Sequence, residues 1–136
     1  MNIKKVIIYA DGAARGNPGP AAIGVTIKDE EGRLITSISR RLGTTTNNQA
    51  EYQAVIAALE TAVSLGASHV DLNVDSELVE RQINGKYRVK NAGLISLYQE
   101  VLQLRSRLQG FSITHVRREQ NTEADKLANK ALDAIR

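Results

Sequence analysis

Four acidic residues are the part of this sequence most able to do chemistry: Asp11, Glu51, Asp75 and Asp125. Carboxylates that share a pocket raise one another's pKa and destabilise a fold unless divalent cations neutralise them. Oxygen ligands suit Mg²⁺, and two such ions about 4 Å apart can hold the attacking and leaving oxygens of a phosphoryl displacement. If the four acids meet, they predict metal-dependent cleavage of a phosphodiester bond.

Each acid also has an ordinary structural interpretation. Asp11 follows an apolar run and could form an Asx turn, whereas Asp75 could cap a short helix. Asp125 could be the third helical residue of a capping box that begins at Thr122. Glu51 shares the apolar face of a predicted helix, where it could favour the helix dipole or extend to the rim. An ionised carboxylate on that face needs a positive partner.

The predicted elements bring these acids to one edge of a sheet. Apolar patterns predict strands at 6–10, 23–27, 34–42, 70–74 and 111–115, and helices at 48–65, up to 83, at 94–108 and from 122 onward. The order βββαβααβα is typical of an α/β fold with a mixed five-stranded sheet and helices on its faces. Strand ends and helix starts can meet at one edge of such a sheet, so we expect the four acids to share a pocket.

Length and composition narrow the classes of protein. A length of 136 residues favours a single domain that spans residues 1–136. The chain has no Cys and only two His, which excludes thiolate nucleophiles and zinc–thiolate sites, so any metal must be held by oxygen. No apolar run near the start is long enough for a signal peptide or a membrane span. We therefore expect a cytoplasmic protein without membrane contact.

Positive charge is concentrated in one stretch of the chain. Between residues 76 and 118 eight Lys and Arg stand against three Glu, although the whole chain carries only +3. This asymmetry indicates a polyanionic partner. With four Tyr, one Phe and no Trp, a base-stacking platform is not expected. A polyanionic partner would therefore be recognised through its backbone and not through its bases.

Five motifs, in this order and at these spacings, together resemble type 1 ribonuclease H. They are Tyr9-Ala10-Asp11-Gly12, Gly16-Asn17-Pro18-Gly19-Pro20, Thr45-Thr46-Asn47-Asn48-Gln49-Ala50-Glu51, Val74-Asp75-Ser76 and Asn121-Thr122-Glu123-Ala124-Asp125. The similarity spans nearly the whole chain, in a compact form without the extra basic helix of many members. It implies a ribonuclease H-like fold and an endonuclease that hydrolyses the RNA strand of RNA/DNA hybrids. The implied products carry 5′-phosphate and 3′-hydroxyl ends.

The resemblance also implies roles for particular residues. The four acids would hold two Mg²⁺ ions, with Mn²⁺ as a substitute; Asp11 would bridge both ions, and Glu51 would also sense the 2′-hydroxyl beside the cut. Asn17 would contact the minor groove, and residues at the start of the first long helix would contact DNA phosphate and base edges. The full set of implied substrate contacts is Gly12, Asn17, Thr46, Asn47, Asn48, Lys90 and Asn91.

Two departures from the family pattern shape the remaining expectations. The loop before the last acid often carries a His, but here it reads Arg117-Arg118-Glu119-Gln120, so Arg118 is predicted to hold the scissile phosphate or the leaving product. His115 is expected to be a packed or hydrogen-bonded ring. Because compact relatives include some that also cut double-stranded RNA, cleavage of this second substrate stays an open alternative.

A monomer is expected. The alternative function is that of a non-catalytic module that binds A-form duplexes.

Overall fold

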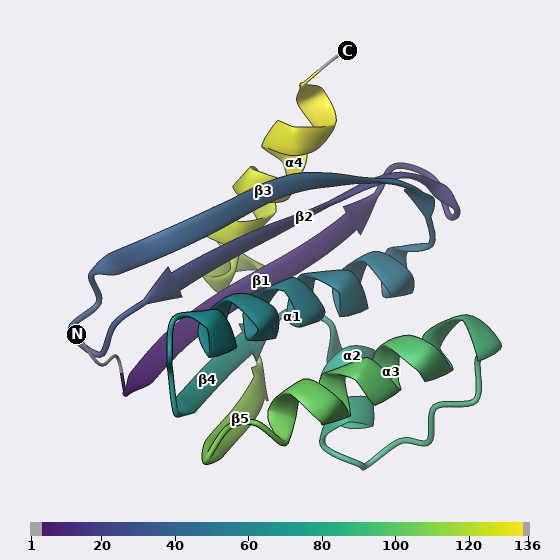
Figure 1. Cartoon of the computed structure of the whole chain (residues 1–136). Coiled ribbons are helices and arrows are strands. Elements are labelled where there is room, and N and C mark those ends of the chain that lie inside the picture. Colours follow the sequence, from purple (N-terminus) through teal and green to yellow (C-terminus); the bar gives the residue numbers. More distant parts are fainter. Residues whose placement is uncertain (1–3, 135–136) are drawn as a thin grey trace.

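The computed structural model describes residues 4–134 and is built on one five-stranded sheet with the strand order β3-β2-β1-β4-β5 (Figure 1). Three long antiparallel strands come first in the chain, and two short strands then pair in parallel on the other side of the first. The strands are β1 (Lys5–Ala14), β2 (Gly19–Lys28), β3 (Leu34–Thr45), β4 (His69–Val74) and β5 (Gly110–His115).

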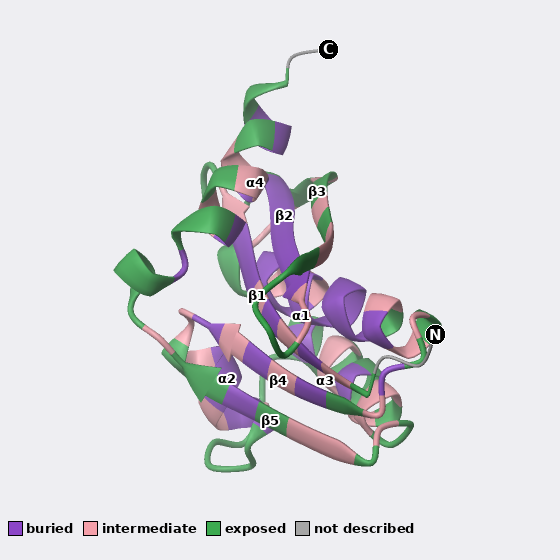
Figure 2. Ribbon diagram, turned by 90° about the vertical axis from the view of Figure 1, so that its left-hand side faces the viewer, coloured by how far each residue is buried: buried purple, intermediate pink, exposed green. Residues whose placement is uncertain are grey.

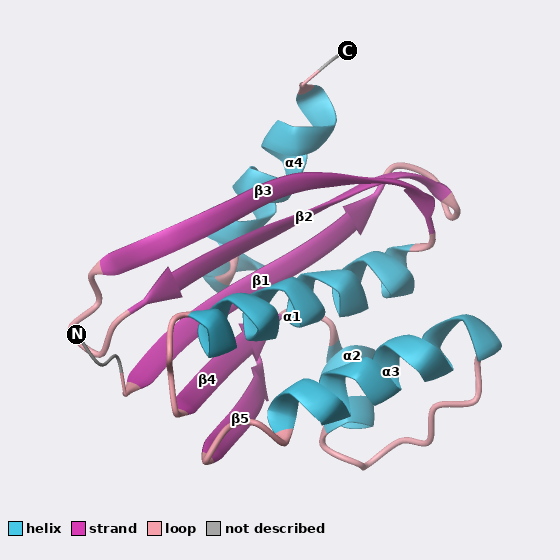
Figure 3. Ribbon diagram, viewed as in Figure 1, coloured by secondary structure: helices cyan, strands magenta, loops and turns pink. Residues whose placement is uncertain are grey.

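Helices cover both faces of this sheet. One face is covered by α1, α2 and α3, and the opposite face of β1, β2 and β3 is covered by α4 (Figure 3). Their bounds are α1 (Asn47–Ser64), α2 (Glu77–Ile83), α3 (Ala92–Arg105) and α4 (Thr122–Asp133), and a short 3₁₀ turn at Arg118–Gln120 precedes α4. The predicted element order and the mixed sheet are confirmed.

The core lies between the sheet and α1. Apolar side chains of β1 and β2 alternate toward this helix, and Figure 2 shows the buried residues along these strands and along the inner side of α1. Tyr52, Ile8 and Leu72 are among the largest side chains that are fully buried. On the opposite face α4 also packs closely, because a Cβ on Gly24 would lie 2.0 Å from the carbonyl oxygen of Ala124. Glycine at this position lets α4 lie directly on β2.

The first strand is longer than predicted. The apolar run ends at Ala10, but β1 continues through Asp11 to Ala14, where it pairs with β2 at Asp11↔Gly24 and Ala14↔Ala21. The interpretation of Asp11 as an Asx-turn residue is therefore wrong. The ladder with β2 supplies hydrogen-bond partners for this polar segment, which local sequence does not reveal. None of the helices in the described part of the chain has the length and apolarity needed to cross a membrane.

Candidate active site

Strand register places two of the acids side by side. The parallel pairing of β1 with β4 ends at Ala10↔Val74, so the next residue on each strand is an aspartate. Beyond this point β1 continues while β4 stops, which opens the edge of the sheet at Asp11 and Asp75. Asp11 is buried and Asp75 is half-buried. Register thus brings the two aspartates together, although only Asp75 follows a strand end and Asp11 lies within β1.

The third acid reaches the same place from α1. Glu51 is buried, and its Oε1 accepts a hydrogen bond of 2.7 Å from the backbone N–H of Gly12. A Cβ on Gly12 would lie 2.2 Å from the backbone of Ala50, so only glycine allows the helix to approach β1 this closely. The expected positive partner is replaced by a neutral backbone donor. Glu51 therefore keeps its second oxygen for another ligand.

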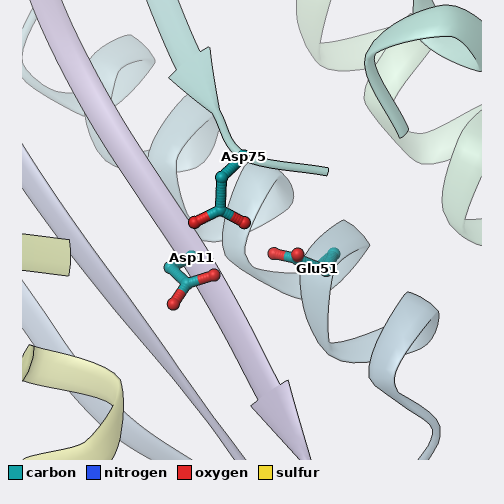
Figure 4. A group of neighbouring side chains, drawn as sticks. All are labelled: Asp11, Glu51 and Asp75. Atoms are coloured by element: carbon teal, nitrogen blue, oxygen red, sulfur yellow. The ribbon is translucent and has the colours of Figure 1, made fainter. Parts of the chain in front are cut away.

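These three carboxylates form a compact group. One oxygen from each of Asp11, Glu51 and Asp75 lies within 4.8 Å of the others, and the three side chains point toward one another (Figure 4). The donor set consists entirely of carboxylate oxygens, which is the set that a hard divalent cation prefers. Within residues 4–134 no Lys, Arg or His forms an ion pair with any of the four acids. The residues present therefore fit a divalent metal site.

The fourth acid lies beside this group. Asp125 is half-buried in the first turns of α4, and it lies close enough to Asp11 for its charge to raise the pKa of that carboxyl. Its Oδ1 also accepts a hydrogen bond of 3.2 Å from Nδ2 of Asn129, one turn further along the helix. The structure thus places the fourth acid beside Asp11, outside the group of three whose oxygens lie within 4.8 Å of one another.

Two of the alternative structural interpretations are wrong for these acids. The residue that caps α2 is Ser76, whose side chain accepts from the N–H of Val79, and Asp75 does not cap it. The residue before α4 is Asn121, so Thr122 is already helical and no capping box forms with Asp125. Neither Asp75 nor Asp125 therefore has the helix-capping role that the local sequence suggested.

Burial and mutual repulsion change the acidity of the group. Burial raises the pKa of Asp11 to about 7, with further contributions from the neighbouring charges of Asp75 and Asp125. Burial and the charge of Asp11 also raise the pKa of Glu51 well above its ordinary value, although the N–H of Gly12 opposes this. Full ionisation of these carboxylates is costly, and a bound cation removes the cost.

The predicted substrate contacts lie at one end of the molecule. Two hydrogen bonds join the turn between β1 and β2 to α1. The N–H of Asn47 donates to Oδ1 of Asn17 at 3.0 Å, and Oδ1 of Asn47 accepts from the N–H of Ala14 at 3.3 Å. Thr46 caps α1, and Asn48 is exposed in the first turn. Figure 1 shows this turn and the start of α1 at the same end of the sheet.

The loop between α2 and α3, which carries Lys86, Arg88 and Lys90, ends beside the start of α1. Lys90 and Asn91 are exposed, and Asn91 caps α3 by accepting from the N–H of Gly93 at 2.7 Å. Gln49 was not given a role from sequence, yet its side chain completes a capping box with Thr46 and approaches the carbonyl of Gly93 at 3.5 Å. The spacing Thr-x-x-Gln is the sequence signal that could have found it.

The remaining candidates have different surroundings. Arg118 is exposed in the 3₁₀ turn, and among residues 4–134 its guanidinium has no hydrogen-bond or ion-pair partner. His115 ends β5 with its side chain exposed, so the expectation of a packed or hydrogen-bonded ring is wrong. Asn121 occurs in one of the five motifs, but no role was expected for it from the sequence. In the structure it is buried and its side chain contacts Asp75.

Comparisons with known proteins agree with this fold and site. A family model described as "Reverse transcriptase-like" matches residues 9–131. Ribonuclease HI of Halobacterium salinarum is 43% identical over 129 residues, which cover 95% of this chain and 65% of the relative. A bifunctional protein of Mycobacterium tuberculosis is 42% identical over 131 residues, which cover 96% of this chain and 36% of that protein. The chain thus spans about two thirds and about one third of these two relatives.

Two solved structures are similar over nearly their whole length. The crystal structure of RNase H1 from Halobacterium salinarum superposes with a TM-score of 0.94 at 43% identity, covering 96% of this chain and 99% of that one. LC11-RNase H1, solved in complex with an RNA/DNA hybrid, has a TM-score of 0.90 at 42% identity, covering 94% and 96%. Fold and site define an α/β domain with a group of acids at one sheet edge that fits a divalent metal ion. The chain belongs to the type 1 ribonuclease H family.

The raised pKa of Asp11 predicts how stability depends on pH. A carboxyl group whose pKa is higher in the folded state stabilises the fold at low pH, and this stability is lost as pH rises through about 7. Without divalent metal, the thermal midpoint should therefore be lower at pH 8 than at pH 5, and Asp11→Asn should raise it at pH 8. Added Mg²⁺ should raise the wild-type midpoint at pH 8.

A second aspartate provides the control for this measurement. The backbone N–H of Arg33 holds the pKa of Asp29 below its usual range at an exposed turn. Asp29→Asn should therefore lower the thermal midpoint at pH 8 rather than raise it. A metal-free wild-type protein that is more stable at pH 8 than at pH 5 would contradict the repulsion within the acid group.

Proposed function

We propose that this chain is an endonuclease that hydrolyses the RNA strand of RNA/DNA hybrids in a reaction that requires divalent cations. The products would carry 5′-phosphate and 3′-hydroxyl ends. The observation that carries the proposal is the group formed by Asp11, Glu51 and Asp75, with Asp125 beside it and without a cationic partner in the described chain. A module that only binds duplexes gains nothing from buried acids that repel one another, so this complete set favours catalysis.

The four acids are the residues that would hold the metal. Carboxylate oxygens suit Mg²⁺, with Mn²⁺ as a substitute, and the raised pKa values of Asp11 and Glu51 are consistent with a need for positive charge at this place. Bound there, divalent cations would neutralise the acids and offset negative charge that develops on the scissile phosphate. Glu51 has one oxygen fixed by the N–H of Gly12 and presents the other, which in this proposal senses the 2′-hydroxyl beside the cut.

The exposed polar end of the molecule would bind the hybrid. Asn17 and residues 46–48 form one connected surface next to the acids, and Lys90 and Asn91 extend it at the start of α3. Two helices present their N-termini at this end, which favours contact with phosphate. The solved complex of LC11-RNase H1 with a hybrid supports this choice of substrate.

The proposal extends to properties of the chain as a whole. Residues 1–136 would act as one catalytic domain, as a monomer and in the cytoplasm. Cleavage of double-stranded RNA is a second activity to be tested, since it shares the 2′-hydroxyl and A-form geometry with the RNA strand of a hybrid. An assay that compares several nucleic acids separates these substrates.

Cleavage of labelled RNA/DNA hybrid should require Mg²⁺ or Mn²⁺ and stop when a chelator is added. Asp11→Asn should abolish turnover while hybrid affinity stays near the wild-type value, because this acid holds metal rather than nucleic acid. Asp71→Asn is a matched control, since Asp71 lies on the neighbouring β4 and pairs with Lys5 away from the group. It should cut at the wild-type rate. Cleavage at full rate in excess chelator would contradict the proposal.

Loss of Arg118 should slow turnover without unfolding the protein. Its exposed guanidinium has no partner in the described chain, so Arg118→Ala should leave the thermal midpoint unchanged. If it holds the scissile phosphate or the product, turnover should fall about 10- to 100-fold, equivalent to a charged contact of about 1.5 to 3 kcal/mol. Arg107→Ala, an exposed arginine after α3, is the control. An unchanged rate for Arg118→Ala would remove it from the site.

A further inference from the structure

A buried asparagine joins three elements of the site. Asn121 is 1% exposed, and its Nδ2 donates to Oδ2 of Asp75 and to the backbone oxygen of Ala10, both at 3.0 Å. Its own backbone oxygen accepts from the N–H of Asp125 at 3.1 Å. One residue therefore connects β1, the segment after β4 and the start of α4.

The orientation of this amide is fixed by its neighbours. Its nitrogen lies between a carbonyl and a carboxylate, which are both acceptors, so the flipped amide would lose both hydrogen bonds. The Oδ1 of Asn121 is buried and has no hydrogen-bond partner in the described chain. The two donor bonds of Asn121 point to a role in the site.

Three acids are held in the same way. Each has one oxygen that accepts from a neutral N–H and one oxygen left over for another ligand: Glu51 from Gly12 at 2.7 Å, Asp75 from Asn121 at 3.0 Å and Asp125 from Asn129 at 3.2 Å. A Lys or Arg in these places would orient the acids equally well but would also cancel their charge. Neutral donors fix the geometry and leave the negative charge for cations.

We infer that Asn121 is a positioning residue of the metal site. By holding Oδ2 of Asp75 it fixes the orientation of this carboxylate, and by its bond to Ala10 it keeps the start of α4, with Asp125, against β1. This inference rests on the proposed metal-dependent function. Groups that orient a metal ligand through a hydrogen bond typically contribute about 10- to 100-fold to metal affinity or activity.

The experiment compares this asparagine with a second one in a similar place. Asn73 on β4 also donates from Nδ2 to a carbonyl of β1, that of Ile8 at 3.1 Å, but it contacts none of the four acids. Asn73→Ala therefore removes an equivalent bond to β1 without touching the site. Asn121→Ala and the volume-keeping Asn121→Leu remove the donor to Asp75 as well. All variants are made in the full chain.

Metal affinity is measured by calorimetric titration with Mn²⁺ alone, and kcat and KM are measured on a hybrid. The Asn121 variants should bind Mn²⁺ about 10- to 100-fold more weakly and have a lower kcat that recovers in part at high Mn²⁺, with KM for the hybrid little changed. Asn73→Ala should lower the thermal midpoint but keep the wild-type Mn²⁺ affinity. A folded Asn121 variant with wild-type Mn²⁺ affinity would overturn the inference, as would equal weakening by Asn73→Ala.

A measurement on the wild-type protein covers the case in which the Asn121 variants do not fold. In nuclear magnetic resonance spectra, the side-chain NH₂ signals of Asn121 should shift during titration with Mg²⁺, whereas those of Asn73 should not. Absence of that shift would contradict the inference. Failure of the wild-type chain to bind Mn²⁺ or to cut hybrid would instead refute the proposed function, so the two failures are distinguishable.

Discussion

Repulsion between carboxylates gathered at one edge of a sheet is the constraint on which this structure depends. Burial raises the pKa of Asp11 to about 7 and that of Glu51 well above its ordinary value, and Asp75 adds its charge to both. A fold that only needed stability would place apolar or paired residues here. Divalent cations bound by the group would make the arrangement favourable, which would link the folding of this edge to the metal-dependent chemistry proposed for the site.

The scaffold holds these charges together by register and by close approach. β1 continues past the end of β4. Asp11 and Asp75, which directly follow the last pair Ala10↔Val74, therefore lie close to each other without being paired in the sheet. Gly12 lets α1 approach β1 so closely that the N–H of Gly12 donates to Glu51. Gly24 lets α4 lie equally close to β2 on the opposite face. Neutral N–H groups orient the carboxylates, so their negative charge remains available to metal.

Much of this could be predicted from the chain itself. Apolar periodicity gave the order of strands and helices, and the placement of Glu51 among Ala54, Val55 and Ala58 predicted its burial. The continuation of β1 through Asp11 could not be predicted, because the ladder with β2 that supports it is a contact between distant segments. The neutral partner of Glu51 and the bonds of Asn121 were missed for the same reason. The expectation for His115 was wrong because local sequence does not show whether the last residue of a strand is covered by another element.

The most direct test of the metal site is diffraction from crystals of the chain soaked in Mn²⁺, with data collected for anomalous scattering. The account predicts an anomalous peak between Asp11, Glu51 and Asp75, at coordination distance from one oxygen of each carboxylate, and its loss in crystals of Asp11→Asn. Manganese bound only elsewhere on the surface, with this group of acids left empty and its geometry unchanged, would contradict it.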